Sequence, residues 1–591
     1  MQRVTPTHHG RFGSCMTTDT ILSDEQKQYL EGFLSAVAAR NGGAGGGMPD
    51  IHRIAQDRFV AAGKSLSAEE EAKRKAPPLD MWDEIGANAA ADRAPKGIDI
   101  FRHKFFGLFY VAPAQDSFMC RLRIPNGILS ASQLTGLADL AEALGGGTLD
   151  VTTRANLQIR EIAPRSALDV LTAIQDLGLT SRGAGADNIR NITGSPTAGI
   201  DPTELIDTRP LARALHFTIL NHRELYGLPR KFNIAFDGGG QISVLEDTND
   251  IGFAAVRVGD GAAVPAGVYF RMVLGGITGH GGFAHDTGIL LKSEECVAAA
   301  VAVVRVFIAH GDRTDRKRAR FKYLLDEWGM DRVMAEVGKE LSFTPPKVPP
   351  AQCLPRGPML KHGHVGIHKQ KQKGMNYIGV GLPVGRLSAA QARGLAAIAR
   401  QFGSGTIRLT VWQNLILSDI SDAKLSGACT AIEEIGLSAE ASPIRGALVA
   451  CTGNTGCKFA ATDTKAQALY LAQYLETRIK LDKPINIHLT GCPHSCAQHY
   501  VGDIGLLGVK VAQGDEMIEG YTIVVGGGAG SEQRIAREIA RDVPFADVAD
   551  RLEALLRGYL AERRNAESFH EFAGRHSVEA LQAMLAAEPV G

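Results

Sequence analysis

The sequence predicts a mixed α/β fold of about three domains, built from two related halves. Three observations predict it. The chain has 591 residues, which is too many for a single hydrophobic core. One stretch of 36 residues occurs twice, with 16 identical positions. The two copies are separated by a proline-rich bridge at 342–358, where prolines prevent a continuous helix or a central strand.

The duplicated stretch covers residues 124–159 and 382–417, which align without gaps. Each copy predicts a strand, a helix that begins at a serine, a glycine turn and a second strand. A second, weaker similarity aligns Thr193-Gly194 with Thr452-Gly453. Because each copy is followed by a longer α/β stretch, the sequence predicts pseudo-twofold symmetry, with a cleft for a ligand between the halves.

Amino-acid composition and the positions of glycine and proline predict the remaining domain boundaries. Residues 1–95 read as an N-terminal extension, partly disordered, with a helix over Leu22–Arg40 and a flexible glycine linker at Gly42–Gly47. The charged pattern of Ser67–Lys75 predicts a helix with a solvent-exposed face. The other expected units are a first half-domain at 96–165, an α/β domain at 166–342, a linker at 343–370, a second half-domain at 371–440, and a final α/β domain with C-terminal helices at 441–591.

Composition excludes several classes of protein. Lys and Arg together equal Asp and Glu at 64 each, which argues against a general nucleic-acid binder. No apolar run reaches the roughly 18–20 residues that a membrane span needs, and the N-terminus lacks the apolar core of a secretory signal. Five cysteines are scattered without a disulfide pattern, which predicts a cytoplasmic protein: Cys15, Cys120, Cys296, Cys353 and Cys429.

Four further cysteines form two closely spaced pairs, Cys451 with Cys457 and Cys492 with Cys496. Four thiolates that converge from two turns can hold a 4Fe–4S cluster or a structural zinc ion, although zinc sites favour tighter spacing in both pairs. Glycines beside each pair suit a backbone that bends around an inorganic group. Four buried cysteines without a ligand are the alternative.

The two segments that carry these pairs, 451–465 and 490–505, resemble the cluster-binding motifs of the sirohaem-containing nitrite and sulfite reductases. The resemblance runs from about residue 100 to about residue 530. It implies the duplicated fold of that family, with ferredoxin-like half-domains and the cofactors between the halves. It further implies that all four cysteines ligate a 4Fe–4S cluster, and that Cys496 also ligates the sirohaem iron.

Sirohaem carries several carboxylates, so its pocket requires fixed cations and hydrogen-bond donors. The stretch 151–160 alternates in polarity and predicts one strand with a continuous polar face, which a solvated strand would share. The resemblance implies instead that this face binds the sirohaem carboxylates, together with Arg230. The face comprises Thr152, Arg154, Asn156, Gln158 and Arg160.

Three other stretches resemble the substrate side of the family's pocket and imply catalytic roles for Arg121, Arg190, Lys231 and Asn233. Alternation predicts that Lys231 and Asn233 share one strand face. The sulfite reductases of the family resemble this motif but have lysine where Asn233 stands. Near neutral pH sulfite is largely a dianion and nitrite a monoanion, so a pocket with one cation fewer favours nitrite.

The expected activity is therefore the six-electron reduction of nitrite to ammonia by a monomer that receives electrons from ferredoxin. No flavin or nicotinamide fingerprint is present, so the donor is external. The alternatives are a sulfite reductase, a precorrin monooxygenase, and a non-enzymatic zinc or electron-carrier protein with four cysteine ligands. The basic run Arg313–Lys322 lies on a predicted helix that either docks an acidic donor or is simply solvated.

Overall fold

The structure is a computed structural model that describes residues 50–440 and 442–586. The predicted helix at Leu22–Arg40, the glycine linker at Gly42–Gly47 and Cys15 lie outside these residues. None of the described helices is both long and apolar enough to cross a membrane. The predicted domain boundaries within the described part stay predictions.

The two repeat copies form two five-stranded sheets that exchange a strand. The first has the order β1 (Leu108–Tyr110), β2 (Phe118–Arg121), β5 (Leu157–Ile162), β4 (Thr148–Val151) and β13 (Arg386–Ser388). The second has the order β11 (Gly366–Lys369), β12 (Met375–Val380), β15 (Leu415–Ser421), β14 (Thr406–Leu409) and β3 (Ile128–Ser130). Strands β3 and β13 each complete the sheet of the other copy, so the duplicated halves interlock.

The helices of the repeat begin where the serines predict. Helix α6 (Ala131–Leu144) starts after Ser130, and α12 (Ala389–Phe402) starts after Ser388. Each serine forms a capping box with the glutamine three residues later, which satisfies two backbone N–H groups at the helix start. The two helices pack against each other, and their buried residues share one hydrophobic core with both exchanged sheets.

Two larger sheets repeat a second topology. One has the order β10 (His285–Leu291), β9 (Gly267–Leu274), β8 (Ile251–Val258), β7 (Ile234–Asp237) and β6 (Thr193–Gly194). The other has the order β16 (Leu448–Ala450), β17 (Ile487–Thr490), β18 (Ile504–Gln513), β19 (Glu516–Val525) and β20 (Arg537–Pro544). In both sheets, the three strands that come first in the chain pair in parallel, and the two that follow in the chain pair antiparallel. This match confirms the predicted duplication beyond the repeated sequence itself.

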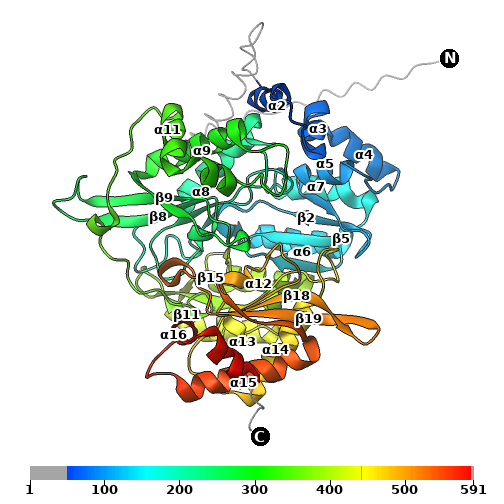
Figure 1. Ribbon diagram of the computed structural model, residues 1–591. Coiled ribbons are helices and arrows are strands. Elements are labelled where there is room, and N and C mark those ends of the chain that lie inside the picture. The colour runs from blue at the N-terminus through cyan, green and yellow to red at the C-terminus, as the bar shows by residue number, and fades with distance from the viewer. Residues whose placement is uncertain (1–49, 441, 587–591) are drawn as a thin grey trace, which may run out of the picture. The chain divides into compact units, whose positions relative to one another are not determined.

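Helices cover these two sheets (Figure 1). The first is covered by α8 (Arg209–Asn221), α9 (Cys296–His310), α10 (Phe321–Trp328) and α11 (Met330–Glu340), and the second by α14 (Thr464–Arg478), α15 (Phe545–Glu562), α16 (Phe569–Arg575) and α17 (Val578–Ala586). The remaining helices are α2 (Ile51–Ala61), α3 (Ala68–Lys75), α4 (Trp82–Ala90), α5 (Asp99–His103), α7 (Ala167–Asp176) and α13 (Leu425–Glu434). The proline-rich bridge at 342–358 has no α-helix or named strand, as predicted.

Of two predictions about charged segments, the helix predicted for the basic run is wrong, and the helix predicted at Ser67–Lys75 is present but only partly exposed. The basic run is not helical before its last two residues, because α10 begins at Phe321 and residues 311–320 form turns and bends. Two of its arginines are buried: Arg313 pairs with Glu70 at 2.6 Å, and Arg320 pairs with Asp250 at 2.9 Å. Glu70 also lies on α3, so the face of α3 that was predicted to be exposed is partly an internal contact. A charge pattern shows which groups are ionic but not which of them find partners.

Candidate functional site

The four paired cysteines lie on two loops at the same edge of one sheet. Cys451 directly follows β16, and Cys492 follows β17 after Gly491. Because β16 and β17 are parallel neighbours, their carboxyl ends bring both loops to one place. The backbone N–H of Gly491 donates to the Sγ of Cys451 over 3.2 Å. A Cβ at Gly491 would lie 2.6 Å from that of Ala460, so this close approach requires glycine.

The four thiols act on one another electrostatically. Burial raises the pKa of Cys492 to about 11, with further contributions from negative charge on Cys496, Cys457 and Cys451. Among the residues described, no three His, Cys, Asp or Glu side chains are grouped closely enough to hold a single metal ion. The charge effects among the thiols nevertheless place all four near one another, and four cysteine thiolates are the usual ligands of an iron–sulfur cluster.

Cys496 faces a space inside the protein. Its side chain is accessible to solvent, although burial is the largest influence that raises its pKa. An exposed residue whose charge is strongly desolvated by the surrounding protein lies in a recess and not on a convex surface. The hydroxyl of Thr153 donates to the carbonyl of Cys496 over 3.1 Å and so joins the two halves at this point. A recess beside it is lined by Thr153, Arg154, Asn249 and Gln498, among others.

Four cationic side chains gather around this space. Burial is the largest influence on each, and it lowers the pKa of Arg121 and of Arg154 to about 10. The pKa of Arg190 falls well below its usual value through burial and the charge of Arg121, and that of Lys231 falls to about 7 through burial and the charge of Arg320. Within the described ranges none of these four pairs with a carboxylate. Buried cations without anionic partners are costly, which indicates an anionic ligand.

Neutral groups hold the arginines of this cluster in place. Arg190 donates to two main-chain carbonyls, each at 2.7 Å. Arg154 donates to the side-chain oxygen of Asn249 at 2.7 Å, and the guanidinium of Arg121 lies over the ring of Phe109 at 4.6 Å. These contacts orient the guanidinium groups without neutralising them, so their charge remains available to a ligand.

Lys231 and Asn233 do not lie on the predicted strand, because β7 begins at Ile234 and both residues precede it. The backbone N–H of Asn233 donates to the Oδ2 of Asp250 at 2.9 Å. The side-chain oxygen of Asn233 is buried and has no hydrogen-bond partner in the protein. A buried amide oxygen without a partner is unusual and suits a residue that meets a ligand or an ordered water.

The single strand predicted over 151–160 is also wrong. Strand β4 ends at Val151 and β5 begins at Leu157, and Ala155 in the intervening turn has a φ of 45°. In this turn the hydroxyl of Thr152 accepts from the backbone N–H of Arg154, and the side chain of Asn156 donates to a main-chain carbonyl of the neighbouring segment. The turn therefore uses Thr152 and Asn156 to present Arg154, and the five polar residues share no common face.

The last two residues of that stretch lie against the first cysteine loop. Arg160 donates to the hydroxyl of Thr452 at 2.8 Å and to the carbonyl of Gly456 at 3.3 Å. It pairs with Asp150 at 3.1 Å and donates to the side chain of Gln158 at 3.2 Å. In this structure Arg160 holds the loop that bears Cys451 and Cys457, a placement that strand alternation cannot show.

Sequence reasoning missed the residues that contact or influence the four clustered cations. Arg320, which lowers the pKa of Lys231, was treated as part of a surface run. Asn249, which orients Arg154, belongs to the pair Asn249-Asp250 directly before β8. The position of this polar pair at the start of a buried strand was the available signal, because buried polar side chains there need partners.

A separate cavity of about 840 Å³ is lined in part by Thr452 and Thr455 of the first cysteine loop. The clustered cations do not line it, and its polar residues carry both signs of charge. The site is therefore assigned to the space at Cys496, where like charges converge on an accessible thiol. The cavity residues include Asp92, Tyr110, Gln115, Glu161, Arg386 and Thr452.

Comparison with known families matches most of the chain. The family described as "Nitrite and sulphite reductase 4Fe-4S domain" matches residues 185–344 and 444–590. The family described as "Nitrite/Sulfite reductase ferredoxin-like half domain" matches residues 111–177 and 368–435. Each family matches twice, in agreement with the duplicated topology. The residues matched by these two families begin at 111, so α2, α3 and α4 lie before the first matched residue.

Individual relatives agree with these families. The chain is 35% identical over 517 residues to a protein named ferredoxin–nitrite reductase from Synechococcus elongatus, covering 84% of this chain and 97% of the relative. It is 38% identical over 473 residues to one of that name from Leptolyngbya laminosa, covering 78% and 89%. The solved structure of the NirA protein of Mycobacterium tuberculosis superposes with a TM-score of 0.81 at 26% identity, covering 88% of this chain and 98% of that one.

Proposed function

The chain belongs to the nitrite and sulfite reductase family, and we propose that it reduces nitrite to ammonia with electrons from reduced ferredoxin. The main support for this function is the set of buried cations without carboxylate partners around the accessible thiol of Cys496. Such a pocket suits a small anion and a cofactor with many carboxylates. Two relatives whose sequences align with this chain over 97% and 89% of their own length are named ferredoxin–nitrite reductase.

The residues present fit the family's two cofactors, sirohaem and a 4Fe–4S cluster. Cys451, Cys457, Cys492 and Cys496 would hold the cluster, and Cys496, which faces the internal space, would also ligate the sirohaem iron. Arg154 and Arg230 would bind sirohaem carboxylates. When bound, these groups supply the electron transfer and the iron at which nitrite reacts.

The substrate side is assigned to Arg121, Arg190 and Lys231. After the effect of burial, the pKa of Arg190 is lowered by the charge of Arg121, and that of Lys231 by the charges of Arg320, Arg190 and Arg230. An anion relieves this repulsion, so nitrite binding is favoured. The same fixed charges stabilise negative charge that develops on the departing oxygens, and they do so without reorganisation during the reaction.

Lys231 is also suited to move protons at its Nζ atom. Burial and the neighbouring cations lower its pKa to about 7, so the ammonium and the amine are both populated near neutral pH. A group with a pKa near the working pH can both hold and release a proton. Reduction of nitrite to ammonia consumes several protons, and Lys231 is the proposed residue that passes them on.

Asn233 is the proposed determinant of the choice between nitrite and sulfite. Its side chain is buried, neutral and without a protein partner for its oxygen, so it adds no charge to the pocket. A dianion such as sulfite would gain more than nitrite from a further cation at this position. The neutral residue therefore favours the monoanion.

Replacement of Asn233 by lysine is expected to raise sulfite turnover relative to nitrite turnover by roughly tenfold or more, because one buried charge is worth several kcal/mol. The ratio of the two kcat/KM values measures the effect. Asn233→Met is the matched control, since methionine has a similar length but no charge. An unchanged ratio in Asn233→Lys, or an equal shift in Asn233→Met, would contradict the role of charge at this position.

The experiment that tests the activity is an absorption spectrum of the purified protein, followed by assays with dithionite-reduced viologen and nitrite or sulfite added separately. A sirohaem spectrum with nitrite-driven reoxidation and stoichiometric ammonia is expected. Turnover of sulfite alone would assign the sister activity instead. A colourless protein that contains zinc would overturn the proposal.

A monomeric, cytoplasmic enzyme is part of this proposal. All cysteines in the described part of the chain are free, which suits a reducing compartment. Light scattering of the purified holoenzyme tests the monomer, since a mass near twice the 63.0 kDa of one chain would reject it.

A further inference from the structure

Helix α3 (Ala68–Lys75) contacts the substrate side of the pocket from outside the family domains, whose matches begin at residue 111. Two of its side chains point into the protein: Glu70 is fully buried, and Lys73 is 9% exposed. Ser67 caps the helix by accepting from the backbone N–H of Glu70 at 3.3 Å. The helix is therefore fixed at its start and presents an ionic pair inward.

The ammonium of Lys73 lies between two segments of the pocket wall. Its Nζ donates to the carbonyl of Leu228 at 2.9 Å and to that of Gly227 at 3.3 Å. It lies 3.4 Å from the Oδ2 of Asp187 and pairs with Glu70 on its own helix. One side chain thus binds the loop 227–233 and the segment 187–190 at the same time.

Those two segments carry the proposed pocket cations and are joined by backbone hydrogen bonds. The N–H of Leu228 donates to the carbonyl of Asp187 at 2.8 Å, and the N–H of Arg190 donates to that of Phe232 at 2.8 Å. Arg190 therefore sits in one segment, and Arg230 and Lys231 in the other. A displacement of either segment would move all three cations.

Asp187 is the anionic centre of this arrangement. Burial acts to raise its pKa, but Lys73, Arg316 and Arg230 together hold it at about 2. Arg316 donates to both of its oxygens, at 2.8 and 2.9 Å, whereas Arg230 lies farther away at 3.6 Å. The charge of Lys73 thus shares in satisfying Asp187, and Arg230 is the most distant of its three cationic partners.

A second layer fixes Lys73 itself. Glu70 accepts from Arg313 at 2.6 Å and from Gln56 of α2 at 2.9 Å. Arg313 is fully buried and comes from the turns before α10, so the layer joins α2, α3 and the basic run. Removing one member of such a buried charge pair is strongly destabilising, because the other charge is left without a partner.

We propose that Lys73 is a positioning residue for the substrate pocket. It does not line the internal space; it fixes the loop 227–233 and the segment 187–190 so that Arg190, Arg230 and Lys231 converge. This inference rests on the proposed function for its kinetic consequence, but its structural core, the anchoring of the loop, does not.

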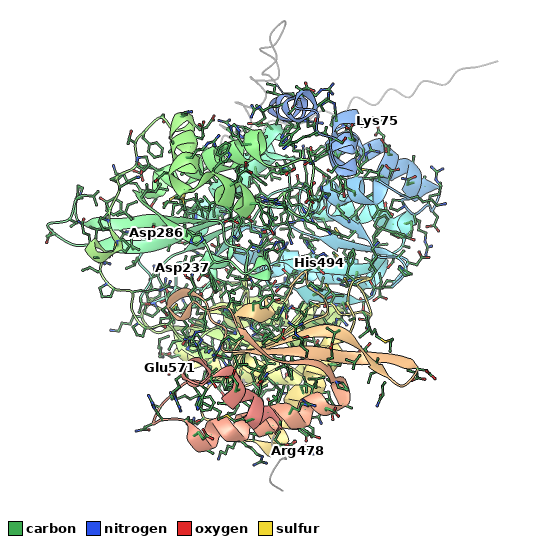
Figure 2. The ribbon with its side chains drawn as sticks, in the orientation of Figure 1. Lys75, Asp237, Asp286, Arg478, His494 and Glu571 are labelled. Carbon is green, nitrogen blue, oxygen red and sulfur yellow. The ribbon has the colours of Figure 1, made fainter. Side chains whose placement is uncertain are left out.

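The test compares full-length holoenzymes with Lys73→Met, Lys73→Arg and, as the matched control, Lys75→Met. Lys75 lies on the same helix and is exposed (labelled in Figure 2). Hydrogen exchange of the backbone amides of Leu228 and Phe232 is expected to be roughly tenfold faster in Lys73→Met, because the loop opens locally more often. Exchange in Lys75→Met is expected to equal that of the unaltered protein, and Lys73→Arg is expected to restore most of the protection.

The kinetic readout is a rise of roughly tenfold in KM for nitrite in Lys73→Met, with a smaller change in kcat, both measured per mole of bound sirohaem. Lys73→Gln, which keeps one donor for the loop carbonyls, replaces Lys73→Met if the latter does not fold. Unaltered exchange of Leu228 and Phe232 in the folded Met or Gln variant would overturn the proposal. Exchange reports on the loop whether the enzyme reduces nitrite or sulfite, so failure of the proposed function is distinguishable from failure of this inference.

Discussion

Replacement of Cys496 by serine is expected to yield a folded protein that retains no sirohaem and no nitrite reductase activity. Serine is nearly isosteric with cysteine, and the carbonyl of residue 496 would still accept from Thr153, so the loop should keep its shape. A hydroxyl, however, is a poor replacement for a soft thiolate ligand. The thiol of Cys496 is the one of the four that is accessible from the internal space.

Visible absorption and iron content of the purified variant measure this effect. Cys429→Ser is the matched control, since Cys429 is a partly buried cysteine on α13, away from both cysteine loops. The control is expected to retain both cofactors. A Cys496→Ser variant that still binds low-potential sirohaem would mean that Cys496 does not bridge the two cofactors.

The second large effect is expected from Lys231→Met, which should lower kcat/KM for nitrite by roughly 100- to 1,000-fold, the usual cost of removing one fixed electrostatic donor. The variant keeps the length of the side chain but removes both its charge and its exchangeable proton. Lys480→Met, at an exposed position, is the control. A decrease below tenfold would show that Arg121 and Arg190 suffice.

The effect of Lys231 should also depend on pH. Burial, and next the charge of Arg320, lower its pKa to about 7, so the ammonium that binds an anion is lost as the pH rises through that value. Nitrite affinity should therefore fall above about pH 7 in the unaltered enzyme and become flatter in Lys231→Met. Stability follows the opposite sign: the unfolded chain keeps this proton up to a higher pH, so the cost of burying Lys231 declines as the pH rises.

Much of the fold could be predicted because the signals are local. The serine caps at Ser130 and Ser388, the glycine turns and the proline-rich bridge are each properties of a few adjacent residues, and the structure confirms them. The exchange of β3 and β13 could not be predicted in this way. Both copies have the same pattern, so neither pattern states which sheet its strand joins.

The site was less predictable, because side-chain direction depends on breaks in regular structure. Alternation over 151–160 assumed an unbroken strand, whereas a turn with a positive φ at Ala155 separates two strands there. The charges of Lys73, Arg313 and Arg320 were assigned to exposed faces because their partners are distant in sequence. The cysteines were easier to predict, since their spacing is itself the signal.

The strand exchange between the repeat copies has a consequence for how the chain is made. During translation the first copy emerges early, yet its sheet lacks an edge strand until Arg386–Ser388 has left the ribosome. Likewise, β3 of the first copy has no pairing strand until β14 of the second copy has been synthesised. The nascent first half therefore carries open sheet edges for most of its synthesis, a state that favours association with other chains.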